Sequence, residues 1–383
     1  MSTIFTGAAI FDGETLRDGL ALVVADGRVA ALVPEAEAPE GDRVRLAGGV
    51  LAPGFIDLQV NGGGGIMLND QPTVAGLATI CAAHAALGTT GLLPTLITDT
   101  PETTRAVIEA GVAAAAAPVP GFLGLHLEGP HLDPRRKGAH DPALIRPMTE
   151  ADLATLTDAA RRLPALLVTL APESATAGQI AALAAAGAVV SVGHTDTDAA
   201  GALGAFAAGA RAVTHLFNAM SPLGHREPGL VGAALDSEGV AAGLIADGFH
   251  VAPIALRAAL AAKRGADGIF LVTDAMAVAG TDLAGFTLNG REILRRDGTL
   301  TLADGTLAGA DVDFPGEIRV LVREGLPLAR ALRMATAAPA RVIRRDDLGR
   351  LRPGGPADFV HLDADLRLAG VWRAGAALGV RSG

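Results

Sequence analysis

The sequence predicts an α/β protein: a (β/α)₈ barrel with a small β-sandwich module built from the two ends of the chain. Short apolar runs alternate with Ala-rich helical stretches through the middle of the 383 residues. Strand-like segments separated by turn residues occupy both ends, and polar residues follow most of the apolar runs. We therefore assign residues 1–50 and 350–383 to the module, and residues 51–349 to the barrel.

Both ends of the chain contain short strand-like runs separated by turn residues. Leu20–Val24 and Val29–Val33 flank Asp26-Gly27, a dipeptide typical of a two-residue β-hairpin turn. Near the other end, a Gly- and Pro-rich stretch leads into Ala357–Leu362, and Leu366–Trp372 follows as one more candidate strand. Two strand-rich ends that flank a different middle indicate that the termini pair into one β module.

The middle of the chain contains eight apolar runs. Continuous apolar runs that alternate with helices indicate parallel strands covered on both faces, and eight such units over this length fit a (β/α)₈ barrel. A doubly wound open sheet is the alternative, but Gly62–Gly65 lacks the Gly-x-Gly-x-x-Gly spacing typical of its first turn. The predicted strands are Gly54–Val60, Gly91–Ile97, Phe122–Leu127, Ala165–Leu170, Ala188–Val192, Ala212–Leu216, Ala241–Ala246 and Ile269–Val272. The predicted helices are Thr73–Ala86, Pro101–Ala114, Glu150–Arg162, Ala177–Ala186, Thr197–Ala208 and Pro253–Ala262.

Composition limits the class of partner. The net charge of −10 argues against a nucleic-acid surface, which is usually basic. A single cysteine, Cys81, excludes an internal disulfide and a Cys-rich metal cluster. No apolar run reaches the length of a membrane span, and Asp12 and Glu14 stand where a signal peptide needs its apolar core. We expect a cytoplasmic protein with neither a nucleic-acid nor a membrane partner.

Chemistry-bearing side chains follow separate apolar runs. Glu128 closes the third run, and His194 and His215 follow the fifth and sixth. Barrel strands bring their carboxyl ends to one rim, so we expect these side chains to meet there. One carboxylate and two imidazoles are a ligand set of hydrolytic zinc, with a fourth position left for water. Asp274 follows the eighth run and is either the base that acts on this water or a cap on the chain that follows.

Several motifs mark a family. Four of them resemble the amidohydrolase superfamily: Pro53-Gly-Phe-Ile-Asp57, Gly193-His-Thr-Asp196, Thr214-His-Leu-Phe-Asn-Ala-Met220 and Val272-Thr-Asp-Ala275. Within that superfamily, five further motifs are similar to the N-acetylglucosamine-6-phosphate deacetylases: His126-Leu-Glu-Gly-Pro130, Lys137-Gly-Ala-His140, Arg226-Glu-Pro-Gly229, Asp247-Gly-Phe-His250 and Leu307-Ala-Gly309. The match covers nearly the whole chain in order, including the split β module.

The resemblance implies a metal centre, but this sequence departs from the superfamily pattern at one pair of positions. Many superfamily members carry His-x-His at the end of the first strand, where a second metal binds. Here Gln59 and Asn61 hold those positions, and neutral amides are poor zinc ligands. We therefore expect one divalent cation per subunit, zinc, bound by Glu128, His194 and His215.

The resemblance also implies the reaction. It predicts hydrolysis of the acetamide of N-acetylglucosamine 6-phosphate to glucosamine 6-phosphate and acetate. Asp274 would take a proton from water and return it to the departing amine, while the metal and His140 or His250 stabilise the oxyanion. A homodimer is expected, with Arg226 binding the phosphate in its own or a neighbouring subunit. The predicted substrate contacts are Gln59, Asn61, Ala139, His140, Asn218, Ala219, Arg226, Asp247, His250, Leu307, Ala308 and Gly309.

Two alternatives stay open at this stage. A hydrolase of N-acetylgalactosamine 6-phosphate or of another N-acyl compound would keep the same metal centre. A non-catalytic phosphosugar-binding protein would be expected to lack Asp274 or a metal ligand, and none is missing. We expect His131 to be structural, and Arg135, Arg136 and Lys137 to form a solvated run.

Overall fold

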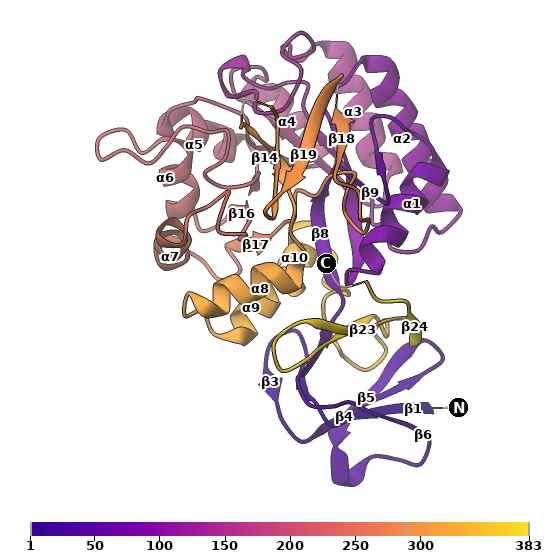
Figure 1. The fold of residues 1–383 in the computed structure, drawn as a ribbon. Helices are drawn as coiled ribbons and strands as arrows, with labels where there is room; N and C mark the ends of the chain where they lie inside the picture. The colour runs from indigo at the N-terminus through magenta and orange to yellow at the C-terminus, as the bar shows by residue number, and fades with distance from the viewer. Residues whose placement is uncertain (1, 289, 304, 382–383) are drawn as a thin grey trace.

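The eight predicted strands form one parallel sheet that curls into a barrel. The computed structural model describes residues 2–288, 290–303 and 305–381. The strand order is β17-β16-β15-β14-β13-β12-β11-β8, so each strand pairs with the next one along the chain. The barrel prediction is confirmed (Figure 1). Its strands are β8 Phe55–Val60, β11 Thr89–Ile97, β12 Leu125–Glu128, β13 Leu166–Leu170, β14 Val189–Val192, β15 Ala212–Val213, β16 Ala241–Leu244 and β17 Ile269–Leu271.

The first and last barrel strands meet at their carboxyl ends, next to the polar residues Gln59, Asn61 and Asp274. Val60 forms a parallel bridge with Ala275, and the Asn61 amide donates to the Ala275 carbonyl over 2.8 Å. The Asp274 amide donates to the Gln59 carbonyl over 3.1 Å. Closure of the barrel therefore places two segments that are remote in sequence side by side.

Helices surround the barrel, and most of them bury part of their side chains while the rest stay exposed. Local sequence fixes where helix α3 begins, because Thr149 and Asp152 form a reciprocal capping box at its N-terminus. Inside the barrel, Ile56, Leu93 and Leu167 from separate strands pack in one cluster with residues of α10. The helices are α1 Val74–Ala85, α2 Pro101–Ala116, α3 Glu150–Arg162, α4 Ala177–Ala185, α5 Ala199–Ala208, α6 Gly229–Asp236, α7 Pro253–Ala262, α8 Phe314–Arg323, α9 Leu328–Ala335 and α10 Ala337–Val342. None of the helices in the described ranges is long and apolar enough to cross a bilayer.

Strands from both chain ends make up the β module, which lies at one end of the barrel (Figure 1). A four-stranded sheet has the order β5-β4-β1-β6, and the predicted Asp26-Gly27 turn joins β4 to β5. A six-stranded sheet, β24-β23-β22-β7-β2-β3, pairs C-terminal with N-terminal strands, and β7 leads directly into barrel strand β8. The module strands are β1 Ser2–Thr6, β2 Ala9–Phe11, β3 Leu16–Arg17, β4 Leu20–Ala25, β5 Arg28–Pro34, β6 Asp42–Arg45, β7 Val50–Pro53, β22 Phe359–Leu362, β23 Leu368–Arg373 and β24 Ala376–Leu378.

A four-stranded antiparallel insertion follows the last barrel strand. Its strands pair in the order β18-β19-β20-β21, and Ala310 at its end forms a parallel bridge with Ala275. The insertion therefore extends the rim at which the barrel closes. Its strands are β18 Gly285–Leu288, β19 Arg291–Arg296, β20 Thr299–Thr301 and β21 Leu307–Ala310. A short pair formed by β9 Gly62–Gly63 and β10 Ile66–Met67 follows the first barrel strand.

Candidate metal centre and its pocket

Glu128, His194 and His215 form a buried cluster at the carboxyl ends of β12, β14 and β15. Glu128 Oε1 lies 3.3 Å from His194 Nε2 and 3.2 Å from His215 Nε2. The two imidazole nitrogens lie 3.0 Å apart. Zinc ligands at about 2.0–2.1 Å would place neighbouring atoms of a tetrahedron about 3.3 Å apart. The donor set and its spacing therefore fit a divalent cation.

The protonation of the cluster also suits a cation. His194 Nδ1 lies 2.8 Å from the Arg136 carbonyl, which can only accept a hydrogen bond. Nδ1 therefore carries the proton, and Nε2 presents its lone pair to the cluster. Burial alone would raise the pKa of Glu128, but the imidazoles of His194 and His215 beside the carboxylate outweigh burial and hold that pKa well below its usual value. An anionic carboxylate and an imidazole lone pair therefore face one point.

The backbone around both histidines is tightly constrained. Each lies two residues beyond its strand with a positive φ, 47° at His194 and 29° at His215. Gly193 precedes the first of them, and a Cβ there would come within 2.9 Å of the Thr214 side chain. The glycine lets the two strand ends approach closely enough for their imidazoles to meet.

Asp274 lies beside the cluster, with one of its oxygens held by two amides. Its Oδ1 accepts hydrogen bonds from Asn61 Nδ2 at 2.7 Å and from Gln59 Nε2 at 3.1 Å. The Gln59 amide also donates to Glu128 Oε1 at 3.2 Å, so it bridges the two carboxylates. Burial raises the pKa of Asp274, and the nearby charge of Glu128 raises it further. A carboxylate whose pKa is raised is suited to accept and return a proton.

Two further imidazoles line the same pocket in defined orientations. His140 Nδ1 accepts the Thr98 backbone N–H at 3.2 Å, so its proton is on Nε2, which lies 3.9 Å from Glu128 Oε2. Burial lowers the pKa of His140 to about 3, which keeps the ring a neutral donor. His250 Nδ1 lies 2.6 Å from Asp247 Oδ2, and the other oxygen of Asp247 accepts the His250 backbone N–H at 2.8 Å.

The structure brings most of the predicted site residues around one cavity of about 150 Å³. Beyond the cluster and Asp274, the predicted residues that line it are Asn61, Ala139, His140, Asn218, Ala219, His250, Leu307 and Gly309.

Four predicted residues lie outside this lining. Gln59 forms a hydrogen bond with Asp274 and Asp247 with His250, and both of these partners line the cavity. Ala308 is buried among the apolar residues of the insertion. Arg226 is in an exposed loop after β15. Gln59 and Asp247 therefore support residues of the pocket, whereas Arg226 is exposed and outside its own pocket lining.

Four residues of the pocket wall and one supporting contact were not predicted from the sequence. Ile97, Gly138, Ile245 and Met276 also line the cavity. Ile97 ends a predicted apolar run and Ile245 is one residue before the end of another, and this position near a strand end could have marked them as pocket residues. The prediction that Arg136 is solvated is wrong, since its guanidinium lies 2.6 Å from Asp196 and its carbonyl binds the His194 ring.

The other basic residues of that loop and His131 are outside the Glu128, His194 and His215 group. Lys137 is exposed, as predicted. Arg135 is largely exposed but pairs with Asp133 at 2.6 Å, so it is not simply solvated. His131 is buried, and its Nδ1 lies 3.1 Å from the Arg146 carbonyl, a contact that suits a structural role.

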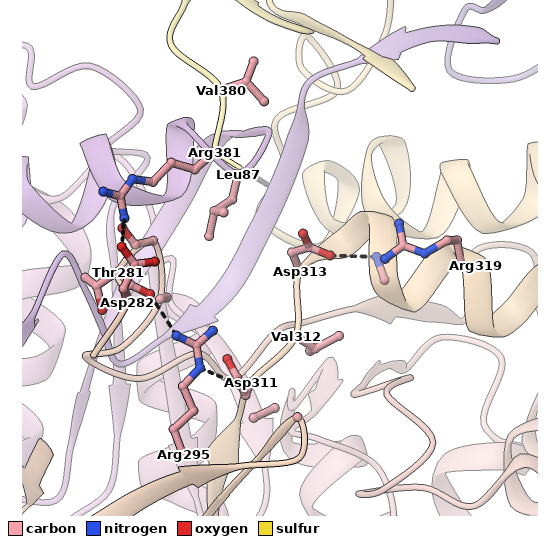
Figure 2. Close-up of a pocket in the computed structure, with 15 residues that line it drawn as sticks. Leu87, Thr281, Asp282, Arg295, Asp311, Val312, Asp313, Arg319, Val380 and Arg381 are labelled. Atoms are coloured by element: carbon pink, nitrogen blue, oxygen red, sulfur yellow. Dashed lines mark hydrogen bonds and ion pairs between the residues drawn. The ribbon is translucent and has the colours of Figure 1, made fainter. Parts of the chain in front are cut away.

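A larger cavity, about 650 Å³, lies among the insertion, the start of α8 and the C-terminal tail (Figure 2). Its charged side chains have partners within the protein. Arg295 contacts Asp311 at 2.7 Å and the Thr281 carbonyl at 2.8 Å, and Arg381 donates to the Gly280 carbonyl at 2.8 Å. These contacts tie the surrounding segments together. Among the residues that the structure describes, the group that can hold a metal lines the smaller pocket.

Known proteins share this chain's sequence and fold. The model of the amidohydrolase family matches residues 50–380. An N-acetylgalactosamine-6-phosphate deacetylase from Shewanella sp. (strain ANA-3) is 43% identical, covering 97% of this chain and 95% of the relative. An N-acetylglucosamine-6-phosphate deacetylase from Haemophilus influenzae is 36% identical, with 93% and 94% covered. The crystal structure of N-acetylglucosamine-6-phosphate deacetylase from Pasteurella multocida superposes with a TM-score of 0.94 at 34% identity, covering 99% of this chain and all of that one.

The chain therefore belongs to the amidohydrolase family. The predicted resemblance is confirmed at the level of the family and at the level of its hexosamine-phosphate deacetylase members.

Proposed function

We propose that this chain hydrolyses the acetamide of N-acetylglucosamine 6-phosphate, releasing glucosamine 6-phosphate and acetate. The arrangement of Asp274 beside the buried Glu128, His194 and His215 cluster supports this most directly, because it joins a metal-type donor set to a proton acceptor in one pocket. Full-length similarity to deacetylases of N-acetylated hexosamine phosphates supplies the substrate class.

The epimer N-acetylgalactosamine 6-phosphate is the second candidate, favoured by the name of the Shewanella relative. The two sugars differ at one hydroxyl and share the acetamide and the phosphate. Measurement of acetate release from both phosphorylated sugars and from their unphosphorylated forms tests the proposal. We expect a phosphorylated N-acetylhexosamine to be the preferred substrate; no acetate from either phosphorylated sugar would refute it.

We also propose that Glu128, His194 and His215 hold one Zn²⁺ ion per chain. The ion would supply a Lewis acid and a water whose pKa is lowered to about 7 in favourable sites. Elemental analysis of the active enzyme should give about one tightly bound divalent ion, because Gln59 and Asn61 donate hydrogen bonds to carboxylates where a second site would need ligands. Two tightly held equivalents would contradict this, and His215→Ala should lose metal and activity together.

The remaining groups have distinct parts in the reaction. Asp274 accepts a proton from the attacking water and returns it to the nitrogen as the amine departs. The Nε2–H of His140, which faces the same pocket, donates to the carbonyl oxygen as negative charge develops there. Asp247 keeps the His250 ring in one orientation through the bond to Nδ1, so that Nε2 faces the substrate side.

We propose a homodimer in which Arg226 completes the neighbouring subunit's pocket. The exposed position of Arg226, outside its own pocket lining, supports this. The cavity of about 150 Å³ is also smaller than the roughly 300–1,000 Å³ of typical ligand sites, so a sugar phosphate would extend beyond it toward the mouth. A cytoplasmic location is proposed because the single thiol, Cys81, is buried and unpaired.

Mixed dimers test the shared site. Arg226→Ala and Asp274→Asn subunits, each impaired alone, are combined after mild dissociation. If Arg226 acts across the interface, the mixed dimer has one pocket with both an intact Asp274 and an intact Arg226, and activity should recover. No recovery in a verified mixed dimer would place Arg226 in its own subunit's site.

A further inference from the structure

The side-chain amide of Asn61 is only half satisfied. Its Nδ2 donates to Asp274 Oδ1 at 2.7 Å, and Met276 Sδ lies 3.3 Å away. Its Oδ1 has no hydrogen-bond partner among the described residues, although the residue is only 2% exposed. Buried polar atoms are nearly always partnered, so an orphaned oxygen on a residue that lines the pocket needs a donor that the described residues do not supply.

The orientation of this amide is fixed by its neighbours. A flipped Asn61 would turn its oxygen toward Asp274 Oδ1 and the Asp274 carbonyl, which lies 3.4 Å from Nδ2. Both are acceptors, so the flip would replace attraction with repulsion. The free atom is therefore an acceptor, and it belongs to a residue that lines the cavity with Asp274 and Glu128.

The donor that must approach Asp274 is the nitrogen of the scissile amide. Asp274 returns a proton to this nitrogen, so the two must come within hydrogen-bond reach. Asn61 is hydrogen-bonded to Asp274, so a scissile nitrogen that comes within reach of Asp274 also comes near the free oxygen of Asn61. We propose that Asn61 Oδ1 accepts the N–H of the scissile amide; this inference rests on the proposed deacetylase function.

The contact would orient the nitrogen for departure. As the carbonyl carbon becomes tetrahedral, the nitrogen gains a lone pair that points away from its N–H bond. With that N–H held by Asn61, the lone pair faces Asp274, which supplies the proton as the C–N bond breaks. The amine keeps its original hydrogen and gains this proton, and the oxygen of the water remains in acetate. The same contact favours amides over esters, which have no N–H to donate.

Gln59 provides a matched control. Its amide donates to the same oxygen of Asp274, but Gln59 does not line the cavity. Both residues help to position Asp274, and of the two only Asn61 lines the cavity and carries an orphaned oxygen. A change at Gln59 should therefore impair amide and ester hydrolysis equally, whereas a change at Asn61 should impair amide hydrolysis more.

The experiment compares two substrates in three proteins. kcat/KM is measured for N-acetylglucosamine 6-phosphate and for the ester 2-O-acetylglucose 6-phosphate in the parent, Asn61→Ala and Gln59→Ala, together with metal content and melting temperature. We expect Asn61→Ala to lower the amide-to-ester ratio by about 10-fold, the scale of one hydrogen bond, and Gln59→Ala to leave the ratio unchanged. If Asn61→Ala does not fold, Asn61→Leu fills a similar volume and gives the same comparison.

The outcomes separate this inference from the proposed function. A parent that hydrolyses the amide, combined with an unchanged ratio in the Asn61 variant, would overturn the contact and leave the deacetylase function intact. An equal fall of the ratio in both variants would also overturn it, because the effect would then act through Asp274. A parent that releases acetate from neither phosphorylated N-acetylhexosamine would overturn the proposed function and this contact together.

Discussion

The rim of the barrel and the β module use the backbone differently. At the rim, five residues other than glycine have positive φ beside or within the pocket: His194, His215, Phe217, Ala219 and Asp274, at 47°, 29°, 80°, 50° and 50°. In the module the corresponding residues are Asp26, Leu366 and Ala374, which lie between strands where the chain turns. Such conformations cost roughly 1–2 kcal/mol for a residue with a Cβ, so at the rim they must be stabilised by the surrounding packing.

The two regions also differ in what they bury. The module packs Phe5, Phe359 and Trp372 together, with ring centroids 4.9–5.3 Å apart. The rim buries a carboxylate and two imidazoles whose polar atoms lie 3.0–3.3 Å apart. The contrast indicates that changes in the module should act on stability, whereas changes at the rim should act on chemistry.

The largest effect is expected at the rim. Asp274→Asn keeps the shape of the side chain and removes the proton acceptor, so kcat should fall by roughly 10²–10⁴-fold. Metal content, measured by elemental analysis, should stay near that of the parent because Asp274 lies outside the Glu128, His194 and His215 set. A variant that deacetylates at the parent rate would show that Asp274 only caps the chain.

The module offers the opposite test. Phe359→Ala removes a buried ring that contacts Phe5 and Trp372, and should lower the free energy of unfolding by about 3–5 kcal/mol. The kcat of the folded protein should change little. Leu16→Ala, at a half-exposed position of the module, is the control and should cost less than about 0.5 kcal/mol. A large loss of kcat in folded Phe359→Ala would break the proposed separation.

Arg226, the proposed phosphate-binding residue, tests whether a change near the rim acts on substrate binding without affecting stability. Arg226 is exposed, so Arg226→Ala should leave melting temperature nearly unchanged. It should lower kcat/KM for the phosphorylated sugar by roughly 10–10²-fold, because charge-assisted hydrogen bonds are worth about 1.5–3 kcal/mol each. The unphosphorylated sugar should be little affected, and Arg226→Lys should recover part of the loss. An equal loss on both sugars would assign Arg226 a supporting role instead.

The smallest effect is expected at the N-terminus of helix α3, outside the pocket lining. Asp152 accepts hydrogen bonds from the Thr149 backbone at 2.9 Å and from Arg146 at 2.7 Å. Burial would raise its pKa, but Arg146 and Thr149 outweigh burial and hold that pKa below its usual value. Asp152→Asn should therefore cost about 1 kcal/mol near neutral pH.

The pH dependence of that cost has a defined sign. A depressed folded-state pKa contributes stability above the unfolded value of about 3.9, and this contribution is lost as pH falls through the folded pKa. Denaturant melts of parent and Asp152→Asn should converge as the pH is lowered below about 4. Glu150→Gln, an exposed change in the same helical turn, should show a much smaller difference at every pH.

Local patterns in the sequence account for the barrel and for part of the site. Apolar runs marked its strands because a strand buried on both faces needs apolar side chains throughout. The antiparallel insertion was not predicted, since residues such as Arg291 and Arg295 interrupt its alternation. Ile97 and Met276 could not be recognised as pocket residues, because an apolar side chain looks the same in sequence whether it faces the core or a ligand.

The sequence by itself determined that Glu128, His194, His215 and Asp274 would gather, because parallel barrel strands bring their carboxyl ends to one rim. Only the tertiary structure decided which atoms meet. Gln59 and Asp274 are 215 residues apart in the chain, yet the bond between them exists because the first and last barrel strands close against each other. The same closure aims the nitrogen of the Asn61 amide at Asp274 and leaves its oxygen without a partner among the described residues. Hydrogen-bond direction depends on angles and distances of a few ångströms, which a linear pattern of residue types does not encode.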